Sequence, residues 1–116
     1  MRAVIALSSI VLAAVAAGCT PSECADVLEH TKQIEQALSG DLSAARAPAK
    51  ALGERLAKGG PDWVPLRSES DRLADRIERA GKAPANPEQG AHDARELKAA
   101  IDAWRSAAQG ARGVCN

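Results

Sequence analysis

Residues 86–109, NPEQGAHDARELKAAIDAWRSAAQ, decide the fold of this chain. Apolar side chains recur along this stretch at spacings of three and four residues. They stand at Ala94, Leu97, Ile101, Trp104 and Ala108. Because an α-helix turns once every 3.6 residues, this spacing gathers them into one stripe along one face. The stretch therefore predicts an amphipathic α-helix whose apolar face packs against the rest of the chain.

Glycine, proline and capping residues mark where this helix and three others begin and end. Thr20-Pro21-Ser22-Glu23 opens the first helix and Asn86-Pro87-Glu88-Gln89 opens the last, each with a cap residue followed by a helix-starting proline. Asp41 and Asp62 stand in cap positions before the two helices between them. The predicted ranges are residues 21–39, 42–58, 63–80 and 87–109, the last reaching residue 114 if Gly110 and Gly113 do not end it.

The inward positions of the other helices follow the same spacing of three and four residues. They are Cys24, Val27, Thr31, Ile34 and Leu38, then Leu42, Ala45, Ala49, Leu52 and Leu56, then Trp63, Leu66, Ser70, Leu73, Ile77 and Ala80, with Ala111 and Cys115 continuing the last helix. Four such helices with short connections predict an all-α fold, an up-down-up-down four-helix bundle. The abundance of alanine, which favours helices and is depleted in strands, argues against a β-rich fold.

Pro48 lies inside the second predicted helix. A proline there removes one backbone hydrogen bond and clashes with the preceding turn, so we expect a kink near Ala44 and Ala45. The alternative is a helix that begins at Pro48, with residues 41–47 forming a separate turn. The sequence alone leaves open whether the second helix is continuous through Pro48.

The chain begins with a segment typical of a secretory signal. Met1-Arg2 supplies one positive charge, residues 3–17 carry none, and small residues precede Cys19. The uncharged run is shorter than the roughly 20 apolar residues that a transmembrane helix needs, so a permanent transmembrane anchor is the weaker interpretation. We predict that residues 1–18 are a cleaved signal peptide and that residues 19–116 form the helical bundle domain.

Val15-Ala16-Ala17-Gly18-Cys19 resembles the lipobox of bacterial lipoproteins, although Ala16 stands where leucine is usual. The resemblance covers residues 1–19 only. It implies that the Cys19 thiol receives a diacylglycerol, that the signal is cut before Cys19, and that the new amino group is acylated, for example with palmitate. It also implies a membrane partner, through lipid on Cys19, in the bacterial cell envelope. A secreted protein without lipid is the alternative.

The residue after the modified cysteine bears on which membrane carries the anchor. In Gram-negative members of the lipoprotein class, aspartate at this place favours retention in the inner membrane. Thr20 occupies the place in this chain. The resemblance therefore favours the outer membrane, with the bundle facing the periplasm, over the inner membrane.

The chain has three cysteines, an odd number that would leave one thiol unpaired in an oxidising compartment. If lipid occupies Cys19, then Cys24 and Cys115 remain as a candidate disulfide. Four antiparallel helices bring the start of the first and the end of the last to the same end of the bundle. We predict a bridge between these two cysteines; two free thiols, or pairing between chains, are the alternatives.

Trp63 is the most informative side chain outside the cysteines. Counting the helices up, down and up places it at the end of the bundle that holds Cys24 and Cys115. An indole at that end could rest in the lipid headgroup layer, as interfacial tryptophans do. The alternative is that Trp63 plugs the base of the bundle over the disulfide. Trp104 is predicted to lie in the core.

The sequence offers no catalytic residues, metal ligands or cofactor motif. His30 and His92 each have acidic neighbours one turn away, but the helical rise separates the two histidines by roughly 25 Å in the predicted bundle. No serine carries a nucleophile-elbow motif, and Pro61 follows Gly59-Gly60 where a phosphate loop would need an N–H group. We therefore expect a protein that is not an enzyme and binds no metal or cofactor.

Fifteen basic residues balance fifteen acidic residues, so the charge gives no reason to expect a nucleic-acid partner. We expect a membrane-anchored envelope lipoprotein that acts as a structural or protein-interaction module, with an envelope protein as its partner. Two alternatives stay open. One is a periplasmic sensor of a small molecule or metal, and the other is an inhibitor or immunity-type lipoprotein.

Overall fold

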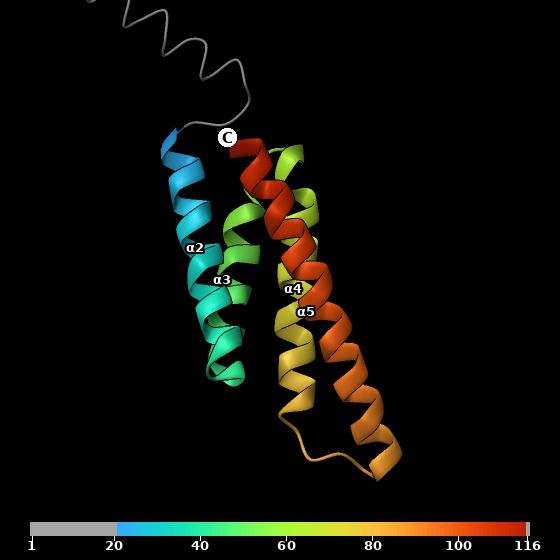
Figure 1. The fold of residues 1–116 in the computed structure, drawn as a ribbon. Coiled ribbons are helices and arrows are strands. Elements are labelled where there is room, and N and C mark those ends of the chain that lie inside the picture. The colour runs from blue at the N-terminus through green and yellow to red at the C-terminus, as the bar shows by residue number, and fades with distance from the viewer. Residues whose placement is uncertain (1–20, 116) are drawn as a thin grey trace, which may run out of the picture.

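A computed structural model describes residues 21–115 of the chain (Figure 1). It contains four α-helices: α2 (Pro21–Ser39), α3 (Arg46–Leu56), α4 (Val64–Ala80) and α5 (Pro87–Cys115). Two short 3₁₀ helices, η1 (Leu42–Ala45) and η2 (Pro61–Trp63), lead into α3 and α4. Within residues 21–115 there is no strand. The prediction of an all-α helical bundle is confirmed.

Successive helices run in opposite directions, so the chain goes down, up, down and up (Figure 1). The start of α2, the start of α4 and the end of α5 lie together at one end of the bundle. We call this end the base, and we define it by the disulfide cysteines and Trp63. The predicted signal peptide, Cys19 and Thr20 lie outside the described residues.

Side-chain caps form at two of the predicted helix starts, whereas the predicted cap at Asp62 is wrong: Asp62 lies inside η2, and α4 begins at Val64 with no side-chain cap hydrogen bond. The Asn86 Oδ1 atom accepts a hydrogen bond from the backbone N–H of Gln89 at 2.8 Å, at the start of α5. The Asp41 Oδ1 atom accepts from the backbone N–H of Ser43 at 3.2 Å, at the start of η1. Each cap pairs a backbone donor that has no partner within its own helix.

The region around Pro48 differs from both predicted alternatives. The α-helix begins at Arg46, after a 3₁₀ turn over Leu42–Ala45, and it ends at Leu56 rather than residue 58. Pro48 is thus the third residue of α3, within the first turn, where a missing N–H group leaves no intrahelical bond unmade. The change from 3₁₀ to α geometry falls beside Ala45, where the sequence predicts a kink.

The last helix takes the longer of its two predicted lengths. It continues through Gly110 and Gly113 to Cys115. Each glycine in a helix interior costs about 1 kcal/mol relative to alanine. The contacts of the last turns offset this cost, since Ala111 is buried and Cys115 is covalently tied to α2.

Most of the predicted inward positions form one core, with two errors at its far end. Val27, Ile34, Leu52, Leu66, Leu73 and Trp104 are almost completely buried. The prediction is wrong for Ala80 and Ala94, which are exposed, whereas Ala74 and Ala100 are buried. The reason is that the helices do not all reach the same height at the end opposite the base. The far end of α4 and the first turns of α5 extend past α2 and α3 (Figure 1).

Charged side chains connect α2 to its neighbours across the surface of the bundle. The Arg105 Nε atom of α5 donates to Glu35 of α2 at 2.9 Å, and Arg55 of α3 pairs with Asp26 of α2. Pairs at such an exposure contribute at most about 1 kcal/mol each. They therefore contribute little to the stability of the fold.

Candidate functional site at the base of the bundle

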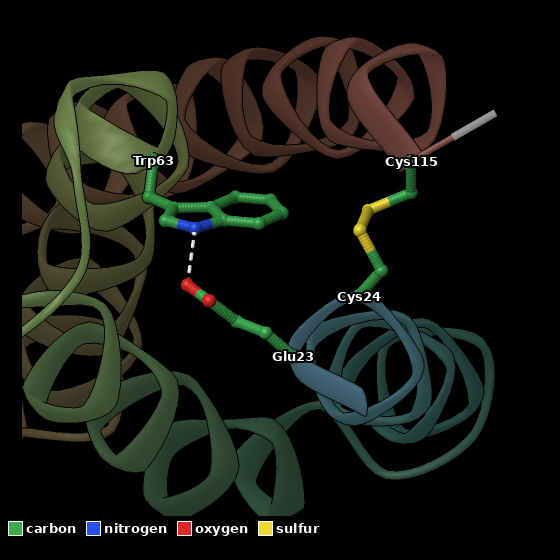
Figure 2. Close-up of a disulfide and its surroundings, with 4 residues drawn as sticks. All are labelled: Glu23, Cys24, Trp63 and Cys115. Carbon is green, nitrogen blue, oxygen red and sulfur yellow. Dashed lines mark hydrogen bonds between the residues drawn. A yellow bond between two sulfur atoms is a disulfide. The ribbon is translucent and has the colours of Figure 1, made fainter. Parts of the chain in front are cut away.

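A disulfide closes the base of the bundle. Cys24 lies in the first turn of α2 and Cys115 is the last residue of α5, and their Cα atoms are 5.6 Å apart (Figure 2). The bond ties together residues that are 91 positions apart in the sequence. The predicted intramolecular bridge is therefore confirmed for this fold.

The indole of Trp63 lies beside the disulfide and fills the base from the opposite side (Figure 2). Its side chain is 1% exposed, and its Nε1 atom donates a hydrogen bond to Glu23 Oε1 at 2.9 Å. A buried indole N–H needs such a partner, and a carboxylate is a strong one. Trp63 is thus enclosed within the bundle, and the structure matches a base plug rather than an indole presented to lipid headgroups.

Close backbone approach at Gly59 allows the indole to sit where it does. A Cβ atom at Gly59 would lie 2.6 Å from Cδ1 of Trp63, a distance that real side chains do not tolerate. The turn at residues 57–60 therefore packs directly on the ring. No local signal in the sequence indicates the contact between Gly59 and Trp63, because this contact depends on tertiary packing.

The only exposed large hydrophobic side chains in residues 21–115 also lie at the base. Val64 begins α4 and is 52% exposed, and Val114 is the penultimate residue of α5 and is 42% exposed. A groove of about 530 Å³ runs between these helices, and its lining includes Pro65, Ala107 and Val114. Periodicity did not single out either valine, because both lie off the inward seams.

Below the base, a second tryptophan forms a buried polar pair in the core. The Nε1 atom of Trp104 donates to the Oγ atom of Ser70 at 3.0 Å, and both side chains are fully enclosed. The sequence placed both residues on inward seams but did not pair them. This contact explains how the core accommodates a serine.

The two histidines have their contacts on their own helices. The His30 Nδ1 atom lies 2.9 Å from the backbone oxygen of Asp26, and the ring of His92 lies 3.9 Å from Glu96. Across residues 21–115, no three His, Cys, Asp or Glu side chains are grouped so as to hold a metal ion. The features that distinguish the base are therefore structural: the disulfide, the hydrogen-bonded Trp63 and the two exposed valines.

None of the helices in residues 21–115 combines the length and the apolar character needed to cross a membrane. Comparisons of the chain with protein-family models, with curated proteins and with solved structures found no match.

Proposed function

We propose that the protein is a lipid-anchored lipoprotein of a bacterial cell envelope, and that its helical bundle acts as a structural or protein-interaction module. The observation that carries the proposal is the Cys24–Cys115 disulfide. It accounts for two of the three cysteines, and the third, Cys19, is the one in the lipobox-like sequence. Disulfides are typical of compartments outside the cytosol, where lipoproteins are processed.

The position of Cys19 suggests how the anchor holds the bundle. Cys19 precedes the first residue of α2, Pro21, by two positions. Two residues span at most about 7 Å, whatever their conformation. An acyl group on Cys19 therefore holds the base at the bilayer surface. With Thr20 after the cysteine, we expect the outer membrane, with the bundle facing the periplasm.

The shape of the bundle suits a module that presents a surface away from the membrane. The helix α5 has 29 residues, which corresponds to a length of about 43 Å. The loop over residues 81–86 joins α4 to α5 at the end opposite the base (Figure 1). A covalently clamped base would keep this hairpin upright, so that an envelope partner could meet it at a defined height.

Fractionation of cells tests the anchor. We expect the full-length protein in the membrane fraction, extracted by detergent but not by high salt, and a Cys19→Ser variant in the soluble fraction. A Cys24→Ala/Cys115→Ala variant is the matched control, since it loses two cysteines and should stay with the membrane. A Cys19→Ser variant that remains with the membrane would contradict the proposal.

Crosslinking of the anchored protein in intact cells, followed by purification, tests the interaction role. We expect one stoichiometric envelope protein among the products. Stabilisation by a metal ion or small molecule, with no crosslinked partner, would favour a sensor instead. Inhibition of a hydrolase by the purified protein would favour an inhibitor or immunity-type lipoprotein.

A further inference from the structure

Two valines at the base of the bundle remain exposed. Val64 stands in the first turn of α4 and Val114 in the last turn of α5. Within residues 21–115, no other large hydrophobic side chain is exposed. Both of these large apolar side chains lie at the same end of the bundle, beside Trp63 and Cys115, and this end is therefore the candidate contact surface.

The path of the chain identifies what covers this end. The base also holds the start of α2, and Cys19 lies only two positions before that helix. If Cys19 carries acyl chains, the bilayer lies within about 7 Å of the start of α2. A surface at this end then faces lipid. A protein partner at the base would have to fit into the gap of about 7 Å between the bundle and the bilayer.

The charged residues near the base suit a lipid interface. Lys58 follows α3, and Arg112 stands one turn before the end of α5; both are exposed. Their long side chains can reach lipid phosphates while their stems cover apolar surface. Asp62 is exposed nearby, and its negative charge offsets part of their positive charge. The Glu23 carboxylate accepts the hydrogen bond of the Trp63 indole. The base therefore carries no strong net charge, and its valines supply the apolar contact.

We propose that the base of the bundle seats in the headgroup layer of the membrane, with Val64 and Val114 as its apolar contacts. The inference rests on the proposed lipid anchor. The exposed fractions of the two valines add up to about one whole side chain. Burying that area changes a binding equilibrium by about tenfold. This would not hold a free protein on a membrane, but the anchor already supplies a local concentration in the millimolar range.

Photolabelling of the lipidated protein in vesicles tests the seating. The vesicles contain phosphatidylethanolamine, phosphatidylglycerol and a lipid with a photoreactive diazirine near its headgroup. Peptide mass spectrometry then locates the adducts. We expect them in the peptides that carry Val64 and Val114, and few in the peptide that carries the loop over residues 81–86.

A Val64→Asp/Val114→Asn variant should reduce the labelling at both peptides by up to about tenfold. Both positions are exposed, and aspartate is favourable in the first turn of a helix, so the fold should persist. Far-UV circular dichroism verifies this. An Ala85→Asp variant, altered in the loop at the opposite end, is the matched control and should be labelled like the parent.

Each outcome separates the seating from the anchor. Equal labelling of the parent and the Val64→Asp/Val114→Asn variant, or adducts spread evenly over the bundle, would overturn the seating while leaving the anchor intact. A protein that carries no acyl mass would overturn the proposed function itself, and the seating with it. Intact mass spectrometry of the same sample reads this directly.

Discussion

Replacing both Cys24 and Cys115 by alanine is expected to lower the free energy of unfolding by about 4.6 kcal/mol. The disulfide joins residues 91 positions apart. Closing a loop of this length removes about 15 cal/mol/K of conformational entropy from the unfolded chain, which is about 4.6 kcal/mol at 25 °C. Domains of this size are stable by only roughly 5–15 kcal/mol. The bridge therefore contributes a large share of the stability.

Urea unfolding followed by far-UV circular dichroism measures this difference. Both proteins carry Cys19→Ser, so that no third thiol can exchange with the bridge. Alanine is the suitable replacement because Cys24 is buried, and a hydroxyl there would lack a partner. If the double variant is unfolded without urea, sucrose can be added to refold it, since sucrose favours the folded state. Its free energy of unfolding is then extrapolated to zero sucrose.

Reduction of the parent protein by dithiothreitol supplies a control without mutation. It removes the same bridge, so the reduced parent should lose the same free energy as the double variant. A loss below about 1 kcal/mol in both comparisons would refute the reasoning. It would mean that the closed loop does not constrain the unfolded chain, and that the packing of the helices alone carries the fold.

Three smaller perturbations are read in the same urea titration. Ser70→Ala should destabilise the protein by about 1–3 kcal/mol, because it leaves the buried indole N–H of the core tryptophan without an acceptor. Glu23→Ala should cost about 1–2 kcal/mol by removing the acceptor of the indole at the base, and Glu23→Gln should cost less because it keeps an acceptor oxygen. Gly110→Ala should stabilise the protein by about 0.5–1 kcal/mol, since nothing lies within 4 Å of the added Cβ atom and alanine favours the helix.

Each of these predictions has a matched control in the chain. Ser68→Ala, on the same helix as Ser70 but exposed, should change the stability by less than about 0.5 kcal/mol. Gly53→Ala should gain less than Gly110→Ala, because the new Cβ atom would displace the Asp71 side chain. Equal losses for the two serines, equal losses for the two Glu23 variants, or equal gains for the two glycines would show that the assigned contacts are wrong.

Local signals predicted the helix ends well where a cap or a helix-ending residue acts within a few residues. The bounds of α2 match the prediction over residues 21–39, and Asn86 caps α5 as expected. The start of α3 was harder to predict, because a proline is tolerated at any position of a first helical turn and 3₁₀ turns are frequent at helix starts, so several start positions are compatible with Pro48. The local sequence carries too little information to choose between them.

Burial could be predicted only where the neighbouring helices have similar lengths. The spacing rule marks one face of each helix, but it does not say how far each helix reaches past its neighbours. Ala80 and Ala94 follow the spacing of the inward faces and are still exposed, because the end of α4 and the start of α5 extend beyond α2 and α3. Val64 and Val114 lie off the inward faces, so the spacing rule did not indicate that both would lie exposed at the base.

Long-range polar pairs were the least predictable part of the candidate site. The disulfide could be inferred, because the number of cysteines and the topology both restrict it. The hydrogen bond from Trp63 to Glu23 joins residues 40 positions apart, and no spacing or motif indicates it. Such a bond depends on the rotation of two helices about their axes, which packing determines only once the whole bundle has formed.

The intact mass of the protein from a membrane fraction, with and without reduction and alkylation, tests the central claim most directly. We predict a chain that lacks residues 1–18 and carries acyl mass on Cys19. We also predict that Cys24 and Cys115 become alkylated only after reduction. An unacylated mass, or alkylation of those two cysteines without reduction, would contradict a bundle that is anchored by lipid and closed by a disulfide.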